Sequence, residues 1–149
     1  MFRAMVFVIH DAGFIARCAL EAENSAQARL DKILNIIDEC KYGIHDLSRT
    51  ELSHNSGLPR FNMPFELGLY LGCRKFGVKR HRSKKCLILD SEPYRYQRFI
   101  SDIAGQDIQA HNDDISKAIV CIRNWLRANA GRSNIPGGEY ISERYQLFE

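Results

Sequence analysis

The sequence predicts an α/β domain in which helices cover both faces of a mostly parallel β-sheet. Short apolar runs occur at residues 4–9 and 85–90, and weaker strand patterns occur at 42–46 and 107–111. Continuous apolar runs of this length are typical of strands buried on both faces. Segments with helical periodicity separate these runs, and such alternation is typical of a parallel sheet.

Two helices are predicted from the spacing of apolar residues and from residues that stop a helix. In the segment that begins near Ser25, apolar side chains recur three and four apart up to Cys40, and Ser25 is a suitable N-cap. Asp113 or Asp114 is expected to cap a long helix that ends at Gly131, because glycine readily takes the left-handed conformation found at helix ends.

The remaining segments are assigned with fewer signals. Residues 63–76 are predicted to be helical, with a proline in the first turn, where its missing N–H costs nothing. A helical turn is expected within residues 14–22, and a helix is expected over 93–103. The chain of 149 residues is interpreted as one domain, residues 1–149, in which residues 132–149 form a C-terminal tail with a short helix.

The composition excludes some classes of protein. No apolar run approaches the roughly 20 residues that cross a bilayer, and the first ten residues do not have the pattern of a secretory signal. We therefore expect a cytoplasmic protein with no membrane partner. The five cysteines form no CxxC or Cys/His metal spacing, so we expect buried thiols and no metal site.

A basic run, RKFGVKRHRSKK at residues 74–85, holds seven Lys or Arg residues in a chain of net charge +3. One interpretation is a solvated loop before a strand. The other is electrostatic attraction of phosphate in a nucleotide, a nucleic acid or a partner. Few aromatic residues interrupt the run, so nucleic acid is the less favoured ligand.

Polar residues cluster where predicted strands end. In parallel sheets, ligands bind beyond the carboxyl ends of the strands. Asp46 and Ser48 lie at the carboxyl end of one strand, and Glu66 lies near the start of the next helix, so all three are expected to face one crevice. Asp90, the last residue of the strand at 85–90, and His10, after the predicted strand at 4–9, are expected at its edge.

Simpler structural roles compete with a functional site. Glu66 is well placed to favour the helix dipole, and Asp46 is suited to forming a turn. Arg49 and Arg60 are suited to pairing with these acids, and Asn62 to capping the helix. Taken together, the same residues suit cleavage of an N-glycosidic bond, because one carboxylate stabilises an oxocarbenium-like sugar while a second holds ribose hydroxyls. The arginines suit phosphate.

The stretch SGLPRFNMPFELGLYLG, preceded by YGIHDLSR, resembles the superfamily of Toll/interleukin receptor-like (TIR-like) domains and nucleoside 2-deoxyribosyltransferase-like proteins. The resemblance implies a flavodoxin-like three-layer sandwich with four or five strands. It also implies that Glu66, within MPFELG, is catalytic, and that Asp46, within HDLS, is the acid at the strand end. Phe61 stands near the place of a Trp-Cys pair in TIR enzymes and is expected to stack on a base.

The resemblance further implies an activity. Bacterial members of the broad group often cleave NAD or related nucleotides at the glycosidic bond, and many act in antiphage defence. The expected protein is therefore a nucleotide-binding N-glycosidase that uses NAD or a related nucleotide as substrate and needs no cofactor. Hydrolysis, transfer and cyclisation all remain open. The alternative is a non-catalytic module that senses a nucleotide or assembles with like domains or a partner subunit.

Overall fold

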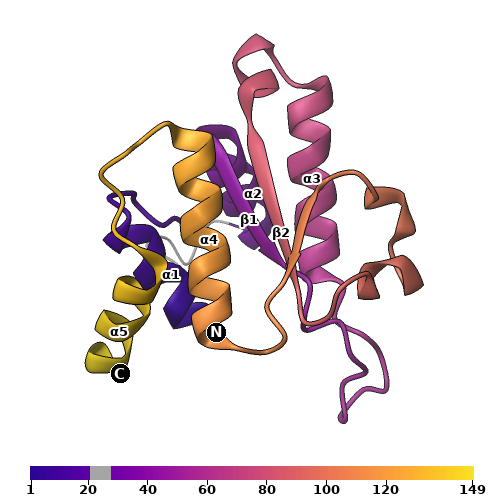
Figure 1. Ribbon diagram of the computed structural model, residues 1–149. Coiled ribbons are helices and arrows are strands. Elements are labelled where there is room, and N and C mark those ends of the chain that lie inside the picture. The colour runs from indigo at the N-terminus through magenta and orange to yellow at the C-terminus, as the bar shows by residue number, and fades with distance from the viewer. Residues whose placement is uncertain (21–27) are drawn as a thin grey trace.

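The computed structural model describes residues 1–20 and 28–149, so the predicted N-cap Ser25 lies outside the described residues. Within them, three parallel strands form one sheet between two layers of helices (Figure 1). The α/β architecture with a parallel sheet is thus confirmed. The described sheet has three strands, however, and not the expected four or five.

The strands are β1 (Tyr42–Asp46), β2 (Lys85–Asp90) and β3 (Asp107–Ala110), in the spatial order β1-β2-β3. All three were predicted from the sequence. The register places Ile44 opposite Leu87, and Leu87 opposite Asp107. Because the strands are parallel, their carboxyl ends lie at one end of the molecule, where α3 and α4 also begin (Figure 1).

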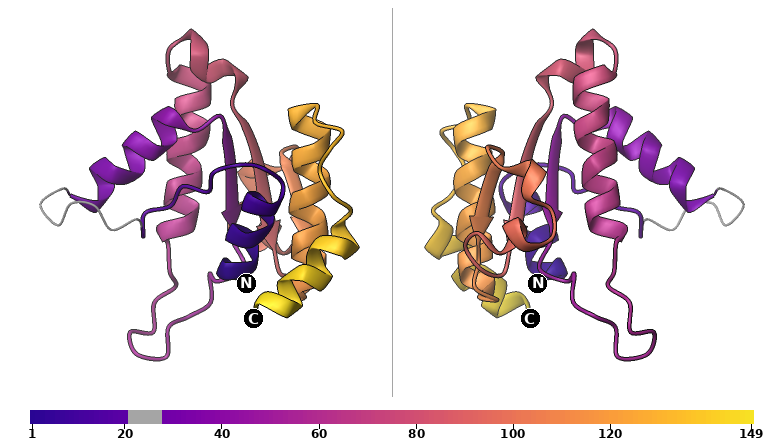
Figure 2. Two further views of the ribbon diagram at one scale, coloured as in Figure 1. Left: turned by 90° about the vertical axis from the view of Figure 1, so that its left-hand side faces the viewer. Right: turned by 90° about the vertical axis from the view of Figure 1, so that its right-hand side faces the viewer.

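The central strand β2 is buried on both faces, which explains its continuous apolar sequence. Leu87 and Leu89 join the core beneath one helical layer, whereas Cys86 and Ile88 join the core beneath the other. The first layer contains α1 (Phe2–Asp11), α4 (Ile115–Ala130) and α5 (Gly138–Phe148). The second contains α2 (Arg29–Glu39) and α3 (Asn62–Phe76), on the opposite side of the sheet (Figure 2).

The predicted strand at residues 4–9 is wrong, because these residues form most of helix α1. Ala4, Val8 and Ala12 recur four apart, and all three are buried in the core shared with α4 and α5. This spacing places them on one side of a helix. A short apolar run suits a buried helix as well as a buried strand, and here the four-residue spacing of the buried side chains favours the helix.

The long helix α4 has the predicted ends. Asp114 is its N-cap, and the carboxylate Oδ1 accepts a hydrogen bond from the backbone N–H of Lys117 at 3.1 Å. At the other end, Gly131 has a φ of 63°, which is the left-handed conformation that glycine adopts without steric cost. Helices α2, α3 and α5 also lie within or close to the predicted segments.

Two local predictions differ from the structure. Residues 93–103 form two short 3-10 helices, η2 (Arg95–Arg98) and η3 (Ser101–Ile103), in place of one helix. The backbone explains the interruption, because Tyr94 has a φ of 60° and Ile100 a φ of −151°, and neither value is helical. Residues 14–20 contain no helix in the described part of the chain.

The basic run winds around the end of the sheet opposite to the carboxyl ends of the strands, at the top of Figure 1. It includes the 3-10 helix η1 (Lys79–Ser83). The Lys84 ammonium is buried and donates to the carbonyls of Ile37, Asp38 and Cys40, which end helix α2. A cation at these carbonyls stabilises the helix end.

Two further expectations concern the cysteines and the membrane. The expected burial of the cysteines holds fully only for Cys86, whereas the other four are half-buried. Within residues 1–20 and 28–149, the helices lack the combination of length and apolarity that crossing a bilayer requires.

Candidate functional site

Asp46 ends β1, and its side chain retains 15% exposure. Its Oδ1 accepts a hydrogen bond from the backbone N–H of Ser48 at 3.0 Å and lies 3.4 Å from Nε2 of His111. Burial alone would raise the pKa of Asp46, but the hydrogen bonds from His111 and Ser48 outweigh it and hold that pKa below its ordinary value. Asp46 is therefore ionised at neutral pH.

The orientation of His111 follows from its two neighbours. His111 directly follows β3, and its side chain is fully buried. Its Nδ1 accepts a hydrogen bond from the backbone N–H of Asp113 at 3.0 Å. A neutral imidazole has one donor and one acceptor. Because Nδ1 is the acceptor, the proton lies on Nε2, which faces Asp46. The pair His111–Asp46 thus joins the carboxyl ends of β1 and β3, the two outer strands.

Asp90 ends β2 and is fully buried. Its Oδ1 accepts hydrogen bonds from the backbone N–H of Ser91 at 2.8 Å and from Nε of Arg95 at 2.7 Å. The same guanidinium donates to the carbonyl of Leu47 at 2.7 Å. Arg95 therefore holds the loop after β1 against the loop after β2. The Oδ2 atom of Asp90 is buried without a hydrogen-bond partner among the described residues.

Glu66 begins the second turn of α3, near the start of that helix as predicted. Its side chain is half-buried, and burial raises its pKa above the ordinary value, an effect that the nearby charge of Arg29 on α2 partly offsets. The described hydrogen bonds and ion pairs do not join Glu66 to Asp46 or to any other residue. Glu66 therefore retains an uncommitted carboxyl group near the start of α3.

The predicted site residues near β1 fall into two groups. Ser48 is buried beside Asp46 and belongs with it. Arg49 and Arg60 lie on the loop of residues 47–61, which extends beyond the carboxyl end of the sheet (Figures 1 and 2). They line the same open hollow of about 410 Å³, together with Glu51, Leu52, Ser53, His54 and Asn55. The structure thus brings the two predicted phosphate-binding arginines together.

Phe61 and Asn62 mark the start of α3. Phe61 occupies the N-cap position and is 65% exposed, so its ring is accessible to a ligand. The structural alternative for Asn62, capping of the helix by its side chain, is wrong, because α3 has no side-chain cap and Asn62 is its first residue. Asn62 is exposed, and the structure assigns it no other role.

His10 does not lie where the sequence placed it. It was expected after a first strand, at the carboxyl end of the sheet, but it lies in the last turn of α1 and is exposed. Helix α1 packs with α4 and α5 on one face of the sheet. The reason for including His10 in the site disappears with the predicted strand.

The sequence analysis did not identify His111 as a site residue. It also did not show that Arg95 connects the loops after β1 and β2. The signal for His111 was present, because it is the last residue of the predicted strand at 107–111, just as Asp46 is the last residue of the strand at 42–46. The signal for Arg95 was weaker. A single arginine in a loop does not indicate which strand ends it bridges, and here it bridges two of them.

Comparisons with known proteins add no identity to this geometry. No family model, no curated protein and no solved structure matches the chain.

Proposed function

We propose that this protein is a TIR-like, flavodoxin-like nucleotide-binding domain that cleaves the N-glycosidic bond of NAD or a related nucleotide, in the setting of bacterial antiphage defence. The observation that carries the proposal is the placement of two carboxyl groups at the carboxyl end of the sheet, Asp46 at the end of β1 and Glu66 near the start of α3. Their pKa values also shift in opposite directions, because the pKa of Asp46 is lowered and that of Glu66 is raised. Such divergence is typical of carboxyl groups with separate catalytic tasks.

Glu66 suits the task of meeting the positive charge that develops on the sugar. As the bond between the sugar C1′ and the base nitrogen breaks, the electron pair leaves with the base and C1′ becomes cationic. The Glu66 carboxylate stabilises or captures that cation, and water then adds to C1′ with loss of a proton. A pyridinium base such as nicotinamide leaves neutral, so the step needs no proton donor for the base, which favours NAD over ordinary nucleosides.

The neighbouring residues suit the remainder of a nucleotide. Asp46 is ionised and held by His111, so it accepts hydrogen bonds from ribose hydroxyls. Arg49 and Arg60, which share one hollow, suit the phosphates. The exposed ring of Phe61 suits stacking on a base.

The proposal is tested by incubating the protein with NAD, nicotinamide mononucleotide and a panel of nucleosides, and detecting released base by mass spectrometry. We expect Glu66→Gln to abolish release while the melting temperature stays unchanged, because Glu66 makes no hydrogen bond or ion pair among the described residues. Glu143→Gln, an exposed change on α5, is the matched control and should keep full activity. Absence of cleavage by the unchanged protein across the panel would refute the enzymatic function.

The pH dependence of this cleavage should report Glu66. The reactive form is the carboxylate, so activity falls as the pH drops through the pKa of Glu66. Because burial raises that pKa, the fall should begin at a higher pH than for an ordinary glutamate, whose pKa is 4.5. If kcat instead falls with a pKa at or below the ordinary value for glutamate, the role of Glu66 is contradicted.

A second candidate function is a non-catalytic module that senses a nucleotide or assembles with copies of itself. Exposed apolar side chains near the start of α3 favour it, because Leu52, Leu58, Phe61 and Phe65 are 54% to 67% exposed, and exposed apolar groups often mark interaction sites. Nucleotide binding without turnover, or mass that rises with protein concentration in light scattering, would support this function over catalysis.

A further inference from the structure

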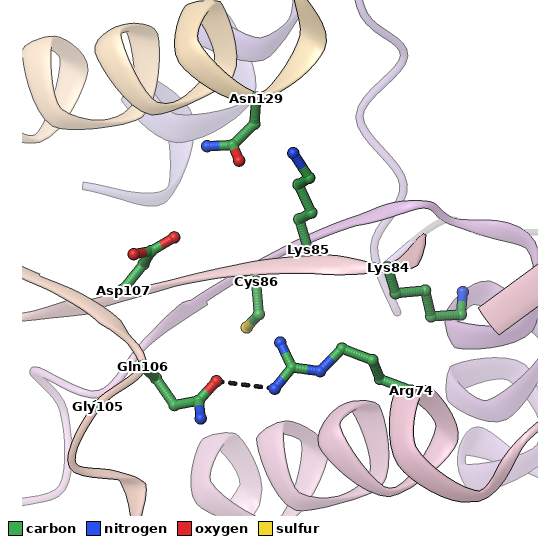
Figure 3. A pocket seen from close by; sticks show the side chains of 8 residues that line it. All are labelled: Arg74, Lys84, Lys85, Cys86, Gly105, Gln106, Asp107 and Asn129. Atoms are coloured by element: carbon green, nitrogen blue, oxygen red, sulfur yellow. Dashed lines mark hydrogen bonds between the residues drawn. The ribbon is translucent and has the colours of Figure 1, made fainter. Parts of the chain in front are cut away.

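A second polar hollow lies at the amino end of the sheet, opposite to the candidate active site. Its volume is about 410 Å³, and it is open to solvent. Arg74 reaches it from the last turn of α3, Lys85 from the start of β2, and Asn129 from the end of α4 (Figure 3). The basic run of residues 74–85 therefore both begins and ends at this hollow.

The hollow exists because β3 starts later than β2. Asp107, the first residue of β3, lies opposite Leu87, so Lys85 and Cys86 extend beyond the end of β3. The backbone N–H of Lys85 donates to the carbonyl of Lys41, on the side of β1. The carbonyl of Asp90 accepts from the backbone N–H of His111, on the side of β3. Backbone groups alternate along a strand, so Cys86, like Asp90, directs its N–H toward the hollow beside β3.

Two cationic side chains flank this N–H from opposite faces of β2. Figure 3 shows Lys85 on the α4 side of the strand and Arg74 on the α3 side, with the Cys86 thiol. A hydrogen bond to Oε1 of Gln106 at 2.9 Å orients the Arg74 guanidinium. The Lys85 ammonium makes no hydrogen bond or ion pair with the described residues. The hollow thus offers one oriented guanidinium and one uncommitted ammonium.

The remaining charges leave the hollow net positive. Asp107 also lines it, and its Oδ2 accepts a hydrogen bond from Nε1 of Trp125 at 3.2 Å, which holds the carboxylate at the wall. Lys84 lines the hollow too, but its ammonium donates to the carbonyls of Ile37 and Cys40 at the end of α2. Burial raises the pKa of the Cys86 thiol to about 12, so Cys86 stays neutral and does not repel an anion.

From the shared hollow, the late start of β3 and the two cations, we infer that Arg74, Lys85 and the Cys86 N–H form a binding site for a phosphate group. Guanidinium, ammonium and backbone N–H groups are the donors that phosphate oxyanions take in proteins. Because this site lies at the amino end of the sheet, it is separate from Glu66 and Asp46 and does not depend on the proposed glycosidase activity.

Two sources can supply such a phosphate, namely a small phosphorylated molecule and the backbone of a nucleic acid. Lys75, Lys79 and Arg82 are exposed in the same basic run. They would add contacts to a polymer but not to a single small anion. The dependence of binding on these three residues therefore distinguishes the two sources.

The test is a binding measurement on the full chain with inorganic phosphate, pyrophosphate and a single-stranded oligonucleotide as separate probes. We expect Lys85→Ala and Arg74→Gln each to weaken pyrophosphate binding about ten-fold or more, since each removes a charged hydrogen bond. Lys75→Ala removes the same charge from the same helix outside the hollow, and it is the matched control for pyrophosphate. Melting curves check that each variant is folded.

The outcomes separate as follows. Pyrophosphate binding lost in Lys85→Ala and kept in Lys75→Ala supports the site with a small phosphorylated ligand. Oligonucleotide binding that needs Lys85, and whose salt slope also falls by roughly one for each of Lys79 and Arg82 removed, supports it with a nucleic-acid ligand. The inference is overturned if folded protein binds no probe, or if Lys75→Ala weakens pyrophosphate binding as much as Lys85→Ala.

Discussion

Two aspartates at neighbouring strand ends are held by different residues and are therefore suited to different tasks. Asp90 is fully buried and tied to Arg95 at 2.7 Å, so it organises the loops around it. Asp46 keeps 15% exposure and is paired with His111, so it remains accessible to a ligand while its charge is fixed. The difference suits Asp90 to an architectural role and leaves Asp46 available for the proposed chemistry.

The contribution of His111 can be measured with two substitutions that each keep one of its contacts. His111→Gln places an amide N–H near the position of Nε2 and keeps a donor to Asp46, whereas His111→Asn keeps an acceptor for the Asp113 N–H and loses that donor. We expect His111→Asn to raise the pKa of Asp46, so that the loss of activity due to protonation of Asp46, which follows that of Glu66 as the pH falls, moves to higher pH. We expect His111→Gln to move it much less. The measurement is the pH profile of kcat/KM.

The comparison of these two variants separates function from folding. His111 is fully buried, so both substitutions are expected to lower the melting temperature. A merely structural histidine would give two variants with unchanged pH profiles. Equal profiles in folded protein would therefore contradict a positioning role for His111.

At the scale of elements, Tyr70 of α3 fixes the distance between that helix and the sheet. Its hydroxyl shares its one proton between the carbonyl oxygens of Lys41, just before β1, and Lys85, the first residue of β2, at 2.8 and 2.9 Å. The ring lies against Gly43, where an added Cβ would come within 2.7 Å of it. Gly43 is therefore required by close packing, because a ring anchored at its hydroxyl cannot move aside.

We expect Gly43→Ala to destabilise the protein by about 1–3 kcal/mol, the usual cost of overpacking a core. Gly68→Ala is the matched control on α3, because no atom lies within 4 Å of an added Cβ there, and alanine in a helix is favoured over glycine by about 0.5–1 kcal/mol. In chemical denaturation, Gly43→Ala should therefore lower the free energy of unfolding and Gly68→Ala should raise it. A neutral Gly43→Ala would show that the Tyr70 ring can shift.

The elements that the sequence predicted correctly are those with a local signature. Asp114 and Gly131 define α4 by the chemistry of helix ends, and the run at 85–90 is apolar because both of its faces are covered. Residues 4–9 have no such signature, since their helix depends on packing against α4 and α5. Asp46 and Ser48 were found from the end of a strand. Their partner His111 required knowledge of the spatial order of strands, which is not local information.

At the scale of the whole molecule, the two ends of the sheet differ in charge and in chemistry. The carboxyl end collects Asp46 and Asp90, with Glu66 near the start of α3, whereas the amino end collects the basic run. Between them lies the buried His45, which is edge-on to the ring of Tyr70 and has no hydrogen-bond partner among the described residues. Burial lowers the pKa of His45 to about 4.

This histidine makes stability depend on pH in a defined window. The folded pKa of about 4 lies below the ordinary value of 6.5, so between these values the unfolded chain binds a proton that the folded chain excludes. The free energy of unfolding is therefore unaffected well above pH 6.5 and falls as the pH drops toward 4, by about 2 kcal/mol at pH 5.

Denaturant titrations between about pH 8 and pH 4 measure the change, with His45→Gln as the comparison. We expect the free energy of unfolding of that variant to change much less with pH, whatever its value at neutral pH. The carboxylate of Asp46, whose folded pKa is lowered from 3.8, adds its own loss only at lower pH, so the two windows are separate. An equal slope in both proteins would assign the effect to other groups.

The burial of Lys84 against the end of α2 allows local opening of the protein to be followed by chemical labelling. The Lys84 amine is enclosed by three carbonyl oxygens, whereas its neighbour Lys85 is exposed. An acylating reagent should therefore modify Lys85 in the native molecule and reach Lys84 only when the end of α2 separates from the sheet. The ratio of label on two adjacent positions, read from one peptide, thus follows the transient opening of this part of the protein.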